Sequence, residues 1–470
     1  MVFSSLTFLC VFLPIVFVAD RLARSITVKN ALLIAASLVF YAYGEPVLVL
    51  LMLASTLFNW GAGLLVARTD GTRKKAALGC AVVVNIGLLA VFKYAGMAVG
   101  TVNGLLGLGL PEPHIPLPLG ISFYTFQALS YVIDVYRGDV EPQISWPRVL
   151  LYISFFPQLV AGPIVKYHDI EREMTERRAT PVDTAAGIRR FCMGLAKKVL
   201  IANVMAKTAD TMFDLGGDAV GCAGAWLAAF AYLLQIYFDF SGYSDMAIGL
   251  GRMFGFHFKE NFDHPYASAS IKEFWRRWHM SLSTWLREYL YFPLGGNRKG
   301  RVRAVTNRII VFLVCGLWHG ASWTFVVWGL LHGLFLLVED VVPIRKLPKP
   351  LGVVYTVLVV TCAFVIFRAD TLAEGMEMLG AMFCGASGGR LAGVLVVEQL
   401  TPLFLATALA GIVLASSLPS RFAQSIGWSN EGVGNRGVVI LSYVCSIVLL
   451  VLCMINLSSG TYNPFIYFRF

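Results

Sequence analysis

Apolar runs of membrane-spanning length recur along the whole 470-residue sequence. An α-helix needs about 20 consecutive apolar residues to cross the hydrocarbon core of a bilayer. Such runs occur near residues 4–19, 30–43, 46–67, 76–95, 97–110, 120–136, 147–165, 187–206, 222–253, 306–320, 322–338, 351–368, 401–418 and 437–458. Some are short and are expected to be re-entrant, so we predict about 11 to 13 true crossings. This pattern predicts an all-α, polytopic integral membrane protein.

The composition agrees with this fold class. Only 14% of the residues are charged, whereas soluble domains average about a quarter. The first apolar run has no basic residue before it, so we interpret it as a span and not as a cleavable signal peptide. Basic clusters follow several runs, at 21–29, 68–75 and 298–308. The positive-inside rule places them in the cytoplasm, which leaves the N-terminus outside.

The formal net charge is +10, but the basic residues are scattered between apolar spans. The charge is therefore typical of cytoplasmic loops, and we do not expect nucleic acid among the partners. The nine cysteines show no CxxC or other metal-like spacing, so neither a disulfide framework nor a metal site is expected.

Three stretches interrupt the apolar pattern: the proline-rich 111–120, the densely charged 166–183, and 256–308. The second is expected to be solvated or interfacial. Within the third, one helical face is apolar and the rest is basic, which predicts an amphipathic helix at the interface or dipping into the protein. The apolar residues are Trp275, Trp278, Leu282, Trp285 and Leu286, and the basic ones are Lys272, Arg276, Arg277 and Arg287. Irregular backbone at membrane depth requires surrounding protein or a wet cavity, so a cavity is implied.

Two of the seven histidines are candidates for chemistry. His319 stands in the uncharged run "FLVCGLWHGASW", and His279 stands in "RRWHMSLS"; each directly follows a tryptophan. Burial lowers the pKa of an imidazole and keeps it neutral, as a general base for a hydroxyl requires. The alternative for each is a packed, structural histidine, and this is the role we expect for His332. Cys315 shares a helical face with His319, but an apolar site makes a thiol inert, so we do not expect a covalent intermediate on it.

Two further groups of polar residues stand out. Asp239, Ser241, Tyr243 and Asp245 lie in an apolar stretch and, with Trp318, are expected to line or support a tunnel. The carboxylates could line an ion pathway, orient a histidine or pair with arginines of a neighbouring segment; we favour the last, structural role. The sequence "GGNRKGRVR" offers Arg298, Lys299, Arg301 and Arg303 as a phosphate-binding group. A plain cytoplasmic retention signal would explain these four residues equally well.

Several motifs occur in one order along the chain: "GISFYTFQALSYVIDVYRG" (120–138), "FFPQLVAGPI" (155–164), "YFDFSGYSDMAIG" (237–249), "NFDHPY" (261–266), "FWRRWHMSLSTWLREYLYFPLGGNRKG" (274–300), "GLWHGASW" (316–323) and "NPFIYFRF" (463–470). Together they resemble the membrane-bound O-acyltransferase family over essentially the whole chain. Within the family, the sequence is most similar to the branch that O-acetylates alginate. Teichoic acid D-alanyl transferases and peptidoglycan O-acetylation proteins are related branches.

The resemblance implies a single membrane domain over 1–470, with a catalytic core near 116–340 between N-terminal spans (1–110) and C-terminal spans (350–470). Half-inserted helices would form a funnel, with a thin layer of protein between a cytoplasmic donor and an extracytoplasmic acceptor. The essential histidine of the family falls on His319 and its second histidine falls on His279.

The resemblance also implies an activity: O-acetylation of an extracellular polysaccharide from the bacterial inner membrane. The co-substrate would be acetyl-CoA or an acyl-carrier thioester, with no bound cofactor. An extracytoplasmic, periplasmic partner acetyltransferase would pass the acetyl group to the polymer. D-alanyl or other acyl transfer to teichoic acid or peptidoglycan is the alternative within the family. Outside it, the alternatives are a transporter that uses Asp239, Asp245 and His319 as a relay, and a scaffold for a soluble transferase.

Overall fold

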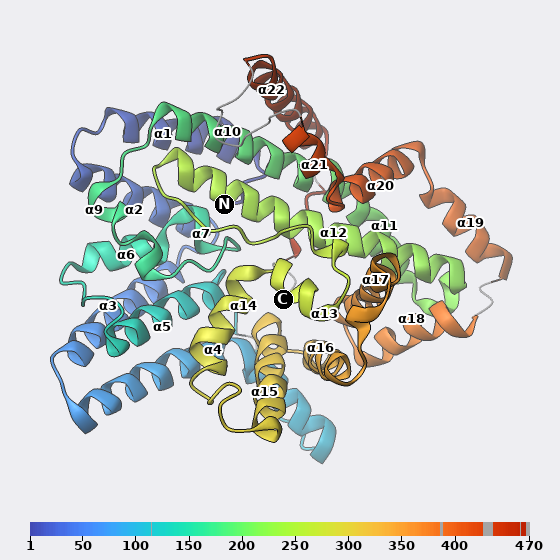
Figure 1. Cartoon of the computed structure of the whole chain (residues 1–470), viewed down its shortest axis with the longest axis horizontal. Coiled ribbons are helices and arrows are strands. Elements are labelled where there is room, and N and C mark those ends of the chain that lie inside the picture. Colours follow the sequence, from blue (N-terminus) through green and yellow to red (C-terminus); the bar gives the residue numbers. More distant parts are fainter. Residues whose placement is uncertain (114, 386–388, 426–435, 461, 467–470) are drawn as a thin grey trace. The chain divides into compact units, whose positions relative to one another are not determined.

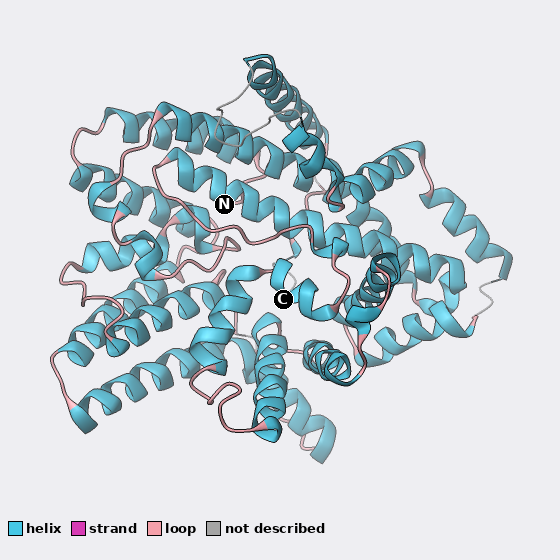
Figure 2. Cartoon of the chain, viewed as in Figure 1, coloured by secondary structure: helices cyan, strands magenta, loops and turns pink. Residues whose placement is uncertain are grey.

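The computed structural model describes residues 1–113, 115–385, 389–425, 436–460 and 462–466 (Figure 1). Within these ranges the regular structure is helical and no strand occurs (Figure 2). This confirms the all-α class. The described chain divides into two compact units, one of Met1–Phe191 with Met246–Lys259, and one of Cys192–Asp245 with Glu260–Phe470.

The first unit contains the N-terminal helices and the charged segment 166–183. Its elements are η1 (Phe8–Phe12), α1 (Leu13–Leu22), α2 (Ile26–Ala42), α3 (Val49–Ala67), α4 (Gly71–Leu106), α5 (Ile121–Arg137), α6 (Trp146–Ser154), α7 (Phe156–Leu159), α8 (Tyr167–Ile170), α9 (Glu173–Glu176), most of α10 (Pro181–Ala196) and the end of α12 (Gly217–Met253).

The second unit contains the remaining helices and both candidate histidines. Its elements are η2 (Lys197–Ala202), α11 (Asn203–Leu215), most of α12, η3 (Pro265–Ala267), α13 (Ile271–Arg277), α14 (Met280–Leu286), η4 (Arg287–Tyr291), α15 (Arg301–His319), α16 (Trp323–Val341), η5 (Ile344–Lys346), α17 (Lys349–Arg368), α18 (Leu372–Cys384), α19 (Gly389–Gln399), α20 (Pro402–Ala415), α21 (Leu418–Ser425) and α22 (Arg436–Ser459).

Among the described residues, seven helices are long and apolar enough to cross a membrane: α3, α4, α12, α15, α16, α17 and α22. An eighth span is added if the pair Ala392–Gln399 and Pro402–Ala415, bent by 71°, counts as one. The multi-pass architecture is thus confirmed, but the number of such helices is below the 11 to 13 crossings expected from sequence.

The difference has local causes. The predicted runs 76–95 and 97–110 form one 36-residue helix, α4. The run 147–165 is divided, because α6 ends at Ser154 and the short α7 begins just before Pro157, which has no backbone N–H to continue a helix. The run 187–206 falls on a helical stretch that the π-helical turns of η2 interrupt.

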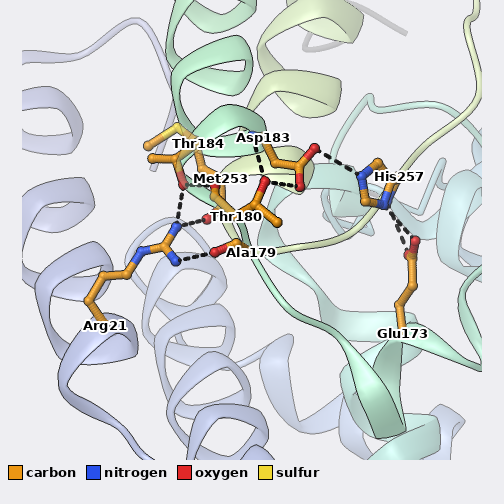
Figure 3. A network of polar contacts seen from close by, with 8 residues as sticks. All are labelled: Arg21, Glu173, Ala179, Thr180, Asp183, Thr184, Met253 and His257. Atoms are coloured by element: carbon orange, nitrogen blue, oxygen red, sulfur yellow. Dashed lines mark hydrogen bonds and ion pairs between the residues drawn. The ribbon is translucent and has the colours of Figure 1, made fainter. Parts of the chain in front are cut away.

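In the first unit, Arg21 joins three segments that are distant in the sequence. Its guanidinium donates to Thr184 Oγ1 at 2.6 Å, to Met253 O at 2.8 Å and to Ala179 O at 3.0 Å (Figure 3). Hydrogen bonds from a charged donor are among the stronger ones in proteins. Arg21 therefore holds α1, the start of α10 and the end of α12 together.

The charged segment 166–183 is partly solvated, and exposed, intermediate and buried side chains alternate along it. Its acids flank the ring of His257, whose Nδ1 lies 2.8 Å from Glu173 Oε1 and whose Nε2 lies 3.5 Å from Asp183 Oδ1 (Figure 3). The hydrogen bond to Glu173 raises the pKa of His257, which favours the protonated ring between the two carboxylates. These contacts fasten the chain just before it enters residues 260–266.

In the second unit, α15 and α16 touch backbone to backbone. A Cβ added to Gly316 would lie 2.2 Å from Phe325 O, and one added to Gly329 would lie 2.3 Å from Phe312 O. Only glycine fits such a crossing, which is how small residues let membrane helices approach closely. The contact lies one turn before His319.

Candidate active site

His319 is the last residue of α15, and its ring is anchored to its own helix. Its Nδ1 lies 2.7 Å from the backbone oxygen of Cys315, four residues earlier. A carbonyl oxygen only accepts, so Nδ1 carries the proton of the neutral ring and Nε2 carries the lone pair. The side chain is buried, and α15 ends directly after it at Gly320.

His279 lies at a break between two helices. The sequence predicted one amphipathic helix through Trp275, Trp278 and Trp285, and this is wrong: α13 ends at Arg277 and α14 begins at Met280. His279 has φ 42° and ψ 55°. A residue with a Cβ in this left-handed region is strained by about 1–2 kcal/mol. The strain turns the chain and directs the imidazole into the second unit, where it is fully buried.

Asn261, which the sequence analysis did not select, holds this break in place. Its backbone oxygen accepts from Met280 N at 2.9 Å. Its Oδ1 accepts from the Ser281 hydroxyl at 2.9 Å and from Ser281 N at 3.1 Å. The same Oδ1 lies 3.2 Å from His279 Nδ1. The sequence feature that could have pointed to Asn261 is its place as the first residue of the "NFDHPY" motif.

The amide also fixes its own orientation. Asn261 Nδ2 donates to Ser244 Oγ at 3.0 Å, which leaves Oδ1 as the atom facing His279. Since Oδ1 is an acceptor, His279 Nδ1 carries the proton and Nε2 carries the lone pair. Nε2 is buried and has no hydrogen-bond partner among the described residues.

The two imidazoles converge although 40 positions separate them in the chain. Their ring centroids are 6.5 Å apart. Trp318 lies beside both, at 5.8 Å from the His279 ring and 5.0 Å from the His319 ring. Burial, followed by the neighbouring His319, lowers the pKa of His279, so its ring is neutral. His332, by contrast, packs as expected: its Nδ1 accepts from the Trp275 indole N–H at 3.3 Å.

A small apolar cavity adjoins His319. Its volume of about 10 Å³ has room for about one water molecule. The lining consists of Ile236, Phe240, Trp278, His319, Trp328, Phe364, Phe367 and Ile466.

A larger cavity, of about 300 Å³, reaches Cys315 one turn before His319. Buried apolar side chains and exposed or half-buried cations both contribute to its wall. The lining residues are Lys272, Trp275, Arg276, Ser283, Leu286, Arg287, Tyr291, Asn297, Arg308, Val311, Phe312, Cys315 and Leu336. This confirms that residues 256–308 help to enclose a cavity.

The four basic residues predicted to bind phosphate lie elsewhere. Arg298, Lys299, Arg301 and Arg303 are exposed, and none of them lines the larger cavity. The cations on its wall are instead Lys272, Arg276, Arg287 and Arg308. Asp340 pairs with both Lys272 and Arg308. Sequence spacing cannot show which basic side chains a fold directs toward a cavity.

The acids of α12 are paired with lysines of η2, where the sequence analysis had favoured arginines. Asp239 lies 2.7 Å from Lys198 Nζ, and Asp245 lies 2.6 Å from Lys197 Nζ. Ser241 between them is buried, and Tyr243 stacks on Phe465 with ring centroids 4.8 Å apart. The two carboxylates are therefore structural ion pairs beside the site.

The chain belongs to the membrane-bound O-acyltransferase family. Residues 140–344, which contain both histidines and the larger cavity, match that family. The protein is accordingly a membrane-embedded acyltransferase, and the resemblance seen in the sequence motifs is confirmed.

Relatives with established names place it further. The chain is 41% identical to the probable alginate O-acetylase of Azotobacter vinelandii, with both chains covered in full. It is 35% identical to the peptidoglycan O-acetyltransferase of Helicobacter pylori, over 81% of this chain and 80% of the relative. It is 31% identical to the teichoic acid D-alanyltransferase of Bacillus subtilis, over 49% of this chain and 62% of the relative.

We expect Asn261→Ala to lower the rate of acyl transfer by about 10²-fold, because His279 loses the acceptor that orients it and a displacement of about 1 Å suffices for such a loss. Ser281→Ala, which removes one neighbour of the same oxygen, is the matched control with a smaller effect.

Asn261→Asp keeps the acceptor but places a carboxylate beside the ring, which raises the pKa of His279. The acidic limb of the pH–rate profile should then move to higher pH. An unchanged profile would show that His279 takes no part in the pH-dependent step.

Proposed function

We propose that this protein O-acetylates an extracellular, alginate-like polysaccharide from the bacterial inner membrane. The acetyl donor is a cytoplasmic thioester, most simply acetyl-CoA. The observation that carries the proposal is the position of His319: its ring is bonded to Cys315 O, and Cys315 lines the larger cavity while the ring itself lines the smaller one. The names of the full-length relatives support the acetyl group and the polymer.

The wall of the larger cavity suits a thioester donor. Its cations would bind the phosphates of coenzyme A, and its buried apolar side chains would surround the uncharged arm and the thioester. Such a water-poor surrounding also protects the thioester from hydrolysis. An acyl-carrier protein would present the same thioester on the same kind of arm, so it remains the alternative donor.

His319 acts as the general base. The acceptor hydroxyl oxygen attacks the thioester carbonyl carbon while Nε2 of His319 takes the hydroxyl proton. The carbon–sulfur bond then breaks, and the departing thiolate takes the proton from Nε2. The products are an ester and a free thiol, and His319 is again neutral. Nε2 of His279, a second buried lone pair near this point, provides a further polar contact.

D-alanyl transfer is the main alternative within the family, because a D-alanyltransferase is also similar to this chain. That relative covers only 49% of the chain, whereas the alginate O-acetylases cover all of it. We therefore favour acetyl transfer. A donor comparison decides between the two: D-alanyl loaded on a carrier protein should not replace acetyl-CoA.

The first test concerns the base. We expect His319→Ala to abolish acyl transfer while the protein stays folded in detergent, since a positioned general base contributes about 10² to 10⁴ in rate. His279→Ala should cost less in kcat or act more on binding. Release of thiol from acetyl-CoA and transfer to polymer are both measured.

Cys315→Ala is the control for the base experiment. It preserves the backbone oxygen that anchors His319 and should be nearly neutral. Near-normal polymer acetylation by the His319→Ala protein would eliminate the mechanism, and complete inactivity of Cys315→Ala would favour a covalent thioester on that residue instead.

The second test concerns the donor site. We expect the double variant Arg276→Gln, Arg287→Gln to raise the apparent KM for acetyl-CoA by about tenfold or more, because charge-assisted hydrogen bonds contribute about 1.5–3 kcal/mol each. The salt dependence of KM should become weaker. The matched control is Arg301→Gln, Arg303→Gln, which removes the same charge from exposed positions off the cavity wall. An equal or larger increase in the control would assign donor binding to residues 298–303.

The third test concerns the acceptor side. The longest polar stretches of the chain, 166–183 and 256–308, carry basic clusters that the positive-inside rule assigns to the cytoplasmic face. Little of the described chain is thus left to bind a polymer outside. We expect the purified protein in proteoliposomes to cleave acetyl-CoA slowly without acetylating soluble alginate. Adding an extracytoplasmic, hydrolase-like partner transferase encoded nearby should restore transfer. Efficient polymer acetylation by this chain alone would make it the complete enzyme. It would refute the idea that a partner transferase passes the acetyl group to the polymer.

A further inference from the structure

Residues 462–466 are docked within the second unit by side chains from three elements. Tyr462 OH donates to Asp210 Oδ2 at 2.5 Å, and Asn203 Nδ2 donates to Asn463 Oδ1 at 3.2 Å. Residues 462–465 contain no helical turn that could hold them, yet the side chains of Phe465 and Ile466 are buried. The hydrogen bonds to neighbouring helices therefore determine where it lies.

The ion pair of Lys198 and Asp239 binds the backbone of residues 464–466. Lys198 Nζ donates to Pro464 O, and the backbone N–H of Ile466 donates to Asp239 Oδ2 at 2.8 Å. The other oxygen of Asp239 faces Lys198. A buried ion pair is costly unless further hydrogen bonds satisfy its atoms, and here the backbone of the segment supplies them. This pair, which the proposed acyl transfer does not use directly, thus has a specific role.

The docked segment completes the cavity at His319. Every other lining residue of that cavity lies on α12, α16, α17, the end of α15 or the break before α14, and Ile466 alone comes from residues 462–466. Phe465, its neighbour, turns away and stacks on Tyr243. The cavity has room for about one water molecule. A methyl group is close to this size, so each added methylene would require a lining side chain to move.

We propose that Ile466 sets the size of the acyl group that this enzyme transfers, and that Asp239 and Lys198 are positioning residues which hold it there. The inference rests on the proposed acyl transfer at His319. One methylene in an apolar pocket changes discrimination by about 10- to 200-fold. The small cavity therefore selects acetyl over propionyl and butyryl. Ile466 is the lining side chain that can be shortened without changing one of the long helices around the cavity.

The test compares acetyl-, propionyl- and butyryl-CoA by thiol release and by transfer to acceptor. Ile466→Ala is expected to raise the ratio of kcat/KM for propionyl-CoA over acetyl-CoA by about tenfold or more. Ile466→Val should move the ratio in the same direction by less, and it covers the case in which the alanine variant does not fold. Asp239→Asn, which removes the ion pair, should also broaden the preference because Ile466 is held less firmly.

Phe465→Leu is the matched control, since Phe465 is buried in the same segment and lines no part of the cavity. We expect it to keep the acyl preference of the wild type. An unchanged preference in both Ile466 variants, with acetyl transfer retained, would overturn the inference and leave the proposed function intact. Near-normal acetyl transfer by His319→Ala would instead overturn the proposed acyl transfer at His319, on which the inference rests.

Discussion

The backbone contact between α15 and α16 determines where His319, the proposed base, lies. Between membrane helices there is little hydrophobic driving force, so close packing contributes most of the association. Gly316 and Gly329 allow the two backbones to meet, and His319 follows one turn later. Its ring then has few degrees of freedom left, because Nδ1 is bonded to Cys315 O and Trp328 lies 4.9 Å away. A larger residue at either glycine would move His319 itself.

The second histidine, His279, is positioned in a different way, by a strained backbone conformation. His279 is one of two non-glycine residues with positive φ among those described, and the other is His264 in the same stretch. Strained backbone persists only where its surroundings over-determine it. Here Asn261 does so, with its backbone oxygen on Met280 and its side-chain oxygen on Ser281 and His279. Since the histidine terminates one helix and precedes the next, its ring can project where no residue inside a continuous helix would point.

The sequence was sufficient for the fold class and the family, because these depend on apolar run length and on motifs. It was not sufficient for geometry. The pattern of Trp275, Trp278 and Trp285 fits one helix, and nothing local reveals that His279 breaks it, since tertiary contacts from Asn261 stabilise the break. The larger cavity was hidden from the sequence for a related reason: Arg276 and Arg287 reach its wall through the course of the chain, which spacing in a glycine-rich loop does not reveal.

Two histidines of this chain, His168 and His279, have opposite environments: one favours the protonated ring and the other favours the neutral ring. His168 lies 3.3 Å from Asp134 Oδ2, and this hydrogen bond, with a second one to Asp169, raises its pKa to about 9. Such a ring is protonated at neutral pH and has no lone pair to take a proton. Beside His279 stands the neutral amide of Asn261, and burial lowers the pKa instead. Asp239 and Asp245 of α12 are meanwhile paired with Lys198 and Lys197. Their charges are thereby compensated within the second unit, where the neutral ring of His279 lies buried beside a neutral amide.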